Sequence, residues 1–279
     1  MWTGWRKAQV TWRAAIMGAA LFTLLVMATA AQARKVTSED VLIRTEDGTA
    51  EAVLHYPAMK GKWPSVILWP DAVGIRPIFR DVARKLAAEG YVVLLPNSFY
   101  RTMRPGDAEL NPFDPKVRPL LMAHRTTATP EGIKRDAAAY LAYLDGRRET
   151  DRRKMAGTIG YDLGASYAVL TAVALPKRVA AVGSVYGVAV ATVRPDSPHL
   201  LVPKTRASYY IAIAKDADAR EPEDKDDLRA VLRQGNLEGT VEVYPADHGW
   251  ANPAGRTYDR EAAERAFRAL VDLLKAKLG

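Results

Sequence analysis

Gly160-Tyr161-Asp162-Leu163-Gly164-Ala165 has the form of a nucleophile elbow, a sharp turn that joins a strand to a helix. Its glycines leave room for a strained backbone, which lifts the central side chain above the sheet and beside the first N–H groups of the helix. Residues 155–159 before it are apolar like a buried strand, and residues 166–175 after it are rich in Ala, Leu and Val. This context favours an elbow over a plain Asp turn. The central position holds Asp162, where Ser or Cys is usual.

Apolar strand patterns alternate with helical patterns on both sides of this turn. Two strand patterns, at 41–45 and 50–56, flank an Asp-Gly turn and predict a hairpin. Further strands are expected at 65–69, 91–96, 155–161, 179–186, 208–214 and 240–244, and helices at 78–89, 130–144, 166–175, 222–233 and 258–278. This order predicts one α/β domain whose mostly parallel sheet carries helices on both faces. Ligands of such sheets bind at the carboxyl ends of the strands.

Residues 97–129 interrupt this alternation. Four prolines in this segment, at positions 105, 112, 115 and 119, are expected to break regular structure. A connection of this length is often functional. Two interpretations are open: this segment covers the site, or it is a surface loop without a role there.

The first 33 residues are typical of a secretory signal peptide. Arg6, Lys7 and Arg13 precede an apolar stretch over about residues 14–30, which ends in the cleavage pattern Ala31-Gln32-Ala33. We therefore expect an exported protein, periplasmic or secreted, whose domain spans residues 34–279 and is not inserted in the membrane after cleavage. An uncleaved N-terminal anchor is the alternative, because the apolar stretch is near the length that spans a bilayer.

Composition excludes several classes of function. The 279 residues are 48% hydrophobic, as suits one large globular domain. The net charge of +8 falls to +5 once the three basic residues of the signal are removed, and basic and acidic residues are interspersed, so nucleic-acid binding is not expected. The absence of Cys excludes disulfides, a thiol nucleophile and a Cys-ligated metal. No glycine-rich phosphate-binding loop occurs, so no cofactor is predicted.

Four further stretches carry a family resemblance. Residues 69–76 read Trp-Pro-Asp-Ala-Val-Gly-Ile-Arg, and residues 92–97 read Val-Val-Leu-Leu-Pro-Asn. Residues 197–201 read Ser-Pro-His-Leu-Leu, and residues 243–250 read Val-Tyr-Pro-Ala-Asp-His-Gly-Trp. With these motifs the chain resembles the dienelactone hydrolase family of α/β-hydrolases across nearly all of the sequence after the signal. The last motif is the most specific, because the family places its catalytic His there.

The resemblance implies roles for individual residues. His248 matches the general base, and Asp162 stands where the family has Cys or, in relatives, Ser. The backbone N–H groups of Leu163 and Ala72 match the oxyanion hole. Asp71 matches a carboxylate that interacts with the nucleophile in the family, although a capping role is an equal alternative for it.

The acid that orients the His is less clear. In the family it follows the strand predicted at 208–214, and here the sequence reads Lys215-Asp216-Ala217-Asp218. An ungapped match puts Ala217 on the acid position. A shift of one residue restores Asp218, which we favour, or Asp216. Another departure is Tyr186-Gly187-Val188, where many relatives have His-Gly-Gly.

Asp162 alters the expected chemistry. A carboxyl with an ordinary pKa of about 3.9 is ionised at neutral pH and needs no base, so His248 would act on water. Attack of a carboxylate on an ester carbonyl gives an anhydride, whereas haloalkane dehalogenases and epoxide hydrolases, which have Asp at this elbow, attack a saturated carbon. Those enzymes use a helical cap, and no inserted helical domain is evident here. A second carboxylate nearby, Asp71, predicts that one of the two pKa values rises. Metal binding by these two carboxylates and His248 is the weaker alternative, because they come from distant loops without a metal-site spacing.

Two functions from different classes remain open. The first is an exported hydrolase of the dienelactone hydrolase type that acts on a small-molecule carboxylic ester or lactone, or less plausibly on a carbon–halogen or epoxide bond. The second is a catalytically degenerate member that keeps its pocket as a binding or interaction module. The elbow glycines, Asp71 and His248 favour the hydrolase, while the altered nucleophile, the unclear acid and Tyr186 favour the module. We favour the hydrolase.

Overall fold

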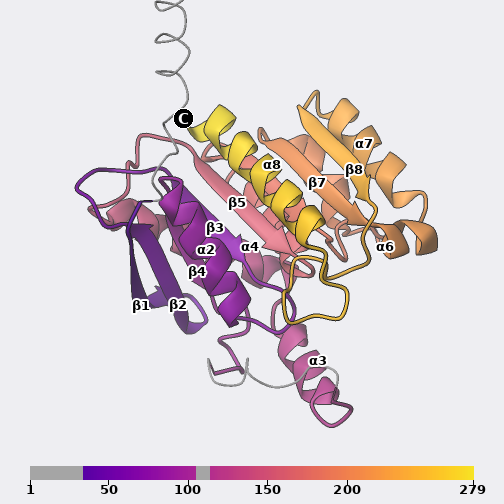
Figure 1. Cartoon of the computed structure of the whole chain (residues 1–279), viewed down its shortest axis with the longest axis horizontal. Coiled ribbons are helices and arrows are strands. Elements are labelled where there is room, and N and C mark those ends of the chain that lie inside the picture. Colours follow the sequence, from indigo (N-terminus) through magenta and orange to yellow (C-terminus); the bar gives the residue numbers. More distant parts are fainter. Residues whose placement is uncertain (1–33, 105–113) are drawn as a thin grey trace, which may run out of the picture. The chain divides into compact units, whose positions relative to one another are not determined.

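The computed structural model describes residues 34–104 and 114–279. They form one eight-stranded sheet in the order β1-β2-β4-β3-β5-β6-β7-β8 (Figure 1). The pairs β1–β2 and β2–β4 are antiparallel, and every later pair is parallel, which confirms the predicted fold class. The strands are β1 (Val36–Thr45), β2 (Gly48–Pro57), β3 (Ser65–Trp69), β4 (Val92–Pro96), β5 (Ala156–Tyr161), β6 (Val179–Val185), β7 (Ser208–Ala214) and β8 (Gly239–Tyr244).

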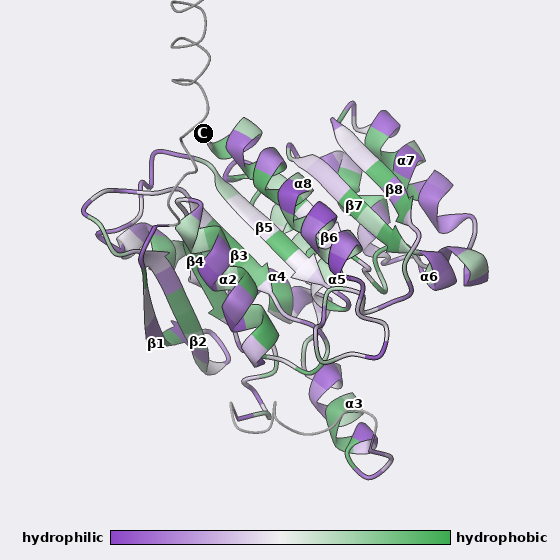
Figure 2. Ribbon diagram, viewed as in Figure 1, coloured by the Kyte–Doolittle hydropathy of each residue, from purple (hydrophilic) through white to green (hydrophobic). Residues whose placement is uncertain are grey.

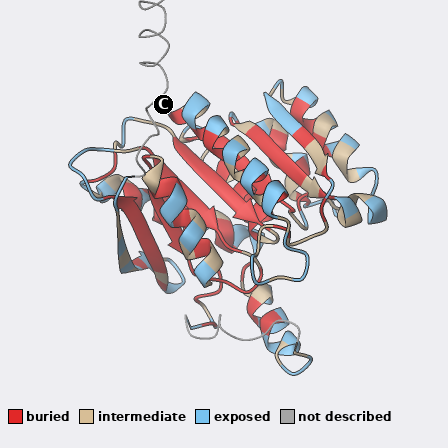
Figure 3. Cartoon of the chain, viewed as in Figure 1, coloured by how far each residue is buried: buried red, intermediate tan, exposed pale blue. Residues whose placement is uncertain are grey.

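Helices cover both faces of the sheet. Two hydrophobic clusters form the core: α2 and α8 pack over one face, and α4, α5 and α7 over the other. The central strands are buried along their length, while the outer faces of the helices are hydrophilic and exposed (Figures 2 and 3). The helices are α2 (Pro77–Ala88), α3 (Arg118–Thr126), α4 (Pro130–Gly146), α5 (Gly164–Ala174), α6 (Lys215–Arg220), α7 (Asp224–Gln234) and α8 (Arg260–Leu278), with a 3-10 helix, η2 (Pro198–Lys204).

The structure corrects the sequence prediction in the long connection after β4. Pro119 was expected to break regular structure, but it lies in the first turn of α3. Proline is tolerated there because the first N–H groups of a helix have no partner within the helix. Two short helices, η2 and α6, were also not predicted. α6 follows β7 directly, at the carboxyl-terminal edge of the parallel strands where the site is expected, and η2 lies in the connection between β6 and β7.

Residues 1–33, where the signal peptide is predicted, lie outside the described residues. Within residues 34–104 and 114–279, no helix combines the length and the apolar character needed to cross a membrane.

Candidate active site

The predicted elbow is present between β5 and α5. Asp162 has a φ of 53°, in the left-handed region that non-glycine residues rarely adopt. Three backbone hydrogen bonds hold Asp162 in this conformation. Its N–H donates to the carbonyl of Val185, and its carbonyl accepts from the N–H groups of Ala165 and Val188, each at 3.1 Å. Such over-determined strain is common at active sites.

Both elbow glycines are required by close backbone contacts. A Cβ atom on Gly160 would lie 1.9 Å from the carbonyl oxygen of Gly164, and one on Gly164 would lie 2.3 Å from that of Pro70. No side chain fits at either position without a backbone shift. The glycines therefore bring the first turn of α5 against the loop after β3, and so place the backbone of Leu163 near that of Ala72, the two residues of the predicted oxyanion hole.

The carboxylate of Asp162 reaches two functional groups. Its Oδ1 lies 3.2 Å from Nε2 of His248, and its Oδ2 accepts a hydrogen bond from the backbone N–H of Ala72 at 3.1 Å. The backbone N–H of Leu163 also donates to the carboxylate. Burial acts to raise the pKa of Asp162, but His248 and these two N–H groups stabilise the charge and hold the pKa below its ordinary value. Asp162 itself therefore occupies the predicted oxyanion hole as an anion.

Asp71 lies beside this centre but is engaged within its own loop. Its Oδ1 accepts from the backbone N–H of Val73 at 2.9 Å, and its Oδ2 accepts from the guanidinium of Arg76. Burial raises the pKa of Asp71, the charge of Arg76 opposes this rise, and the charge of Asp162 adds to it. The pKa of Asp71 is thus the one that rises, as expected, but burial is the largest cause and the charge of Asp162 a smaller one. Asp71 fixes the loop that presents the N–H of Ala72.

His248 follows β8, where the sequence motif predicted it. Its backbone N–H donates to Oδ1 of Asp216 at 2.8 Å, and its carbonyl accepts from the hydroxyl of Thr257 at 2.8 Å. The next residue, Gly249, has a φ of 89°, which lets the chain turn back immediately. The loop is thereby fixed with the imidazole directed at Asp162.

The model of the dienelactone hydrolase family matches residues 50–278. The chain belongs to this family. A Synechocystis sp. protein provisionally named carboxymethylenebutenolidase is 25% identical over 229 residues, which cover 81% of this chain and 91% of the relative. The carboxymethylenebutenolidase of Rhodococcus opacus is 30% identical over 128 residues, or 46% of each chain.

Solved structures share the fold. A Klebsiella pneumoniae protein provisionally named a dienelactone hydrolase matches with a TM-score of 0.75 and 20% identity, over 87% of this chain and 99% of that one. A dienelactone hydrolase-like promiscuous phosphotriesterase, P91, from metagenomic libraries matches with a TM-score of 0.71 and 20% identity, over 88% and 99%. Family membership and the named relatives together point to a hydrolase.

In this family member, Asp218 is not in contact with the imidazole of His248. Its Oδ1 accepts from Nζ of Lys225 at 2.7 Å, so the prediction that Asp218 supports the imidazole is not met. Asp216, the alternative acid, contacts the backbone of His248 and pairs with Arg220 at 3.0 Å. Among the described residues, the only carboxylate within 4.0 Å of a ring nitrogen of His248 is that of Asp162.

The ring of Tyr186 packs against the imidazole of His248. The two ring centroids are 5.1 Å apart in an edge-to-face arrangement. The Tyr186 ring also packs against the rings of Tyr161 and Trp250. Trp250 is fully buried and stacks on Tyr244 at 4.8 Å. Sequence analysis noted Tyr186 only as a departure from the family pattern. The signal that it packs against His248 is that it follows β6 directly, at the same edge of the sheet.

The described residues contain no group of three or more His, Cys, Asp or Glu side chains arranged to hold a metal ion.

Proposed function

We propose that this chain hydrolyses a small-molecule carboxylic ester or lactone, with Asp162 as nucleophile and His248 as general base for water. The proposal rests on the different contacts of the two Asp162 oxygens. Oδ2 accepts a hydrogen bond from the backbone N–H of Ala72 at 3.1 Å, and Oδ1 lies 3.2 Å from Nε2 of His248. Among the described residues, no Lys or Arg forms an ion pair with Asp162. The carboxylate is therefore not locked in a structural pair.

The same geometry selects the bond that is attacked. Acyl attack requires the oxyanion hole to receive the substrate's carbonyl oxygen, but here the hole holds Oδ2 of Asp162. Attack on the saturated carbon of the ester's alkyl–oxygen bond creates no oxyanion on the substrate carbonyl. We therefore assign the first step to that carbon.

In the first step, Oδ1 of Asp162 forms a bond to the alkyl carbon. The bond between this carbon and the ester oxygen breaks, and the substrate's carboxylate leaves with the electron pair. Asp162 is then an alkyl ester. His248 transfers no proton in this step, because Asp162, whose pKa it helps to hold low, is already an anion.

In the second step, Nε2 of His248 takes a proton from water, and the hydroxide attacks Cγ of Asp162. The negative charge develops on Oδ2, where the N–H groups of Ala72 and Leu163 stabilise it. The intermediate collapses with rupture of the Cγ–Oδ1 bond, and the alkoxide leaves with the proton from His248. Asp162 is regenerated with one oxygen from water.

Hydrolysis of a panel of alkyl esters and small lactones tests this function, and aryl esters, whose oxygen-bearing carbon is aromatic and not saturated, are the members expected not to react. The purified protein is expected to turn over at least one member, and Asp162→Ala is expected to lower kcat/KM by about 1,000-fold or more because the nucleophile is gone. Haloalkanes and epoxides belong in the same panel, since they too present a saturated carbon with a leaving group.

A binding module is the second candidate function. It is favoured by one observation, namely that no carboxylate among the described residues supports the second ring nitrogen of His248. Rates equal to those of Asp162→Ala across the whole panel would overturn the hydrolase and leave the module.

We also propose that the chain is exported, either to the periplasm or outside the cell. The basic residues Arg6, Lys7 and Arg13, the apolar stretch after them and Ala31-Gln32-Ala33 support this proposal. Mature protein whose first residue is Arg34 is the expected product, and a chain that keeps Met1 would contradict cleavage.

A further inference from the structure

A cavity of about 190 Å³ lies beside the candidate active site, at the carboxyl ends of β6 and β7. It shares two segments with that site. Val188 lines the cavity and donates its N–H to the carbonyl of Asp162 at 3.1 Å, and Ala217 lines it next to Asp216, which holds the backbone of His248. A ligand in this cavity would therefore flank the reacting centre.

The cavity contains a buried hydroxyl without a partner. Ser184 is 1% exposed and lines the cavity, and within the part of the chain that the structure describes its Oγ has no hydrogen-bond partner. Gly187 leaves this hydroxyl uncovered, since a Cβ there would lie 2.8 Å from it. A buried hydroxyl in a native fold normally has a partner. The orphaned Oγ therefore marks a position where a ligand group can hydrogen-bond.

The walls of the cavity are apolar. Ile211 is the register partner of Ser184 on β7, so both side chains lie on the same face of the sheet. Val190 and Leu228 complete these walls, and all three apolar side chains are at most 5% exposed. Such walls fit a short hydrocarbon chain.

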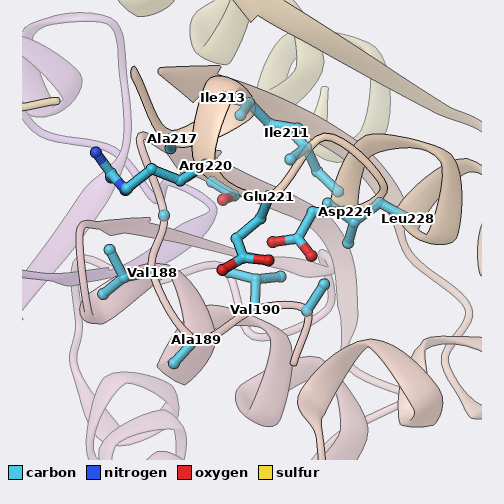
Figure 4. A pocket seen from close by; sticks show the side chains of 13 residues that line it. Val188, Ala189, Val190, Ile211, Ile213, Ala217, Arg220, Glu221, Asp224 and Leu228 are labelled. Atoms are coloured by element: carbon cyan, nitrogen blue, oxygen red, sulfur yellow. The ribbon is translucent and has the colours of Figure 1, made fainter. Parts of the chain in front are cut away.

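Two carboxylates lie over these walls. Figure 4 shows the side chains of Glu221 and Asp224 directed towards Val190 with their carboxylates side by side. The third charged residue, Arg220, directs its guanidinium away from them and pairs with Asp216 at 3.0 Å. Burial raises the pKa of Asp224, and the charges of Glu221 and Asp227 raise it further, while His199 opposes them. The two cavity carboxylates thus repel each other unless a cation lies between them.

We propose that this cavity is a subsite for an alkylammonium group, with the cation between Glu221 and Asp224, the chain against Ile211 and a terminal polar group on Ser184. Its use as a substrate subsite rests on the proposed hydrolase function, whereas ligand binding does not. The combination of an acidic entrance, apolar walls and a buried hydroxyl selects an amphiphilic amine over a carboxylic acid or a plain alkane.

Titration of the purified protein with n-butylammonium, followed by NMR chemical shifts, tests the acidic entrance. We expect saturable binding with a Kd on the order of 1 mM, as suits so small a ligand. The Glu221→Gln, Asp224→Asn double variant is expected to bind n-butylammonium at least about 10-fold more weakly than wild type does. Wild type is expected to bind the neutral 1-butanol as weakly as the double variant binds n-butylammonium. A matched control, Glu223→Gln with Asp226→Asn, removes the same charge from neighbouring residues outside the cavity and is expected to leave Kd unchanged.

Ser184 is tested with 4-amino-1-butanol. Wild type is expected to bind it about 3-fold more tightly than n-butylammonium, and Ser184→Ala is expected to bind the two equally. Non-saturable binding, equal affinity for 1-butanol, or equal losses in the cavity and control variants would each overturn the proposal. Because binding is measured without turnover, a protein that binds amines but hydrolyses nothing contradicts only the proposed function. A protein that hydrolyses esters but binds no amine contradicts only the subsite.

Discussion

His248→Ala is expected to stop turnover while leaving the enzyme alkylated. Attack by Asp162 needs no base, because a carboxyl is ionised at neutral pH and the backbone N–H groups of Ala72 and Leu163 still stabilise the anion once His248, which also lowers the pKa of Asp162, is removed. Hydrolysis of the alkyl ester does need a base, and His248 is the imidazole 3.2 Å from Oδ1. We expect kcat to fall by about 1,000- to 10,000-fold, while the protein gains the mass of the substrate's alkyl group in stoichiometric amount.

Intact-protein mass spectrometry after incubation with a substrate from the panel measures this adduct. Peptide mapping is expected to place it on Asp162, and the double variant Asp162→Ala, His248→Ala is the control that gains no mass. An adduct with the mass of the acyl group, or no adduct on His248→Ala from a substrate that wild type hydrolyses, would rule out alkyl transfer to Asp162.

Gly160→Ala is expected to be the most destabilising small substitution at the elbow. The added Cβ would lie 1.9 Å from the carbonyl oxygen of Gly164, and the three atoms nearest to it are all backbone, so the start of α5 must move. We expect the free energy of unfolding to fall by about 3 kcal/mol or more, as for severe overpacking. Chemical denaturation measures it.

Gly146→Ala is the matched control for this substitution. Gly146 ends α4, and a Cβ there would meet nothing within 4 Å. Alanine favours the helical conformation, so the change is expected to be neutral or to stabilise by up to about 1 kcal/mol. Similar losses in the two variants would mean that the elbow does not depend on the close approach of α5 to β5.

Much of this fold could be predicted because its strands are buried on both faces. β3 and β7 have the predicted bounds, and the elbow between β5 and α5 was predicted from its glycines together with the apolar strand before it and the helical pattern after it. The short helices η2 and α6, of seven and six residues, were missed because segments this short give no clear apolar periodicity. Pro119 was misjudged because proline breaks the interior of a helix but is tolerated in its first turn. The residue type alone does not show which of these two positions a proline takes.

The candidate site was only partly predictable, for a physical reason that α6 illustrates. Consecutive residues of a helix are about 100° apart, so Asp216 and Asp218 face directions that differ by about 200°. Asp216 faces the loop of His248, and Asp218 therefore faces Lys225. Without knowledge that this segment is helical, sequence spacing cannot choose between the two. Likewise, the motif predicted His248, but the aromatic packing of Tyr186 on its ring depends on how two distant loops meet.

Hydrolysis of an open-chain ester in oxygen-18 water tests alkyl transfer to Asp162 most directly. In a single turnover with enzyme in excess, the account predicts label in the peptide that contains Asp162 and none in either product. Over many turnovers, the labelled Asp162 oxygen is expected to pass into the hydroxyl of the alcohol. Label in the product acid, with an unlabelled alcohol and an unlabelled Asp162, would show that water attacks the acyl carbon and would contradict the account.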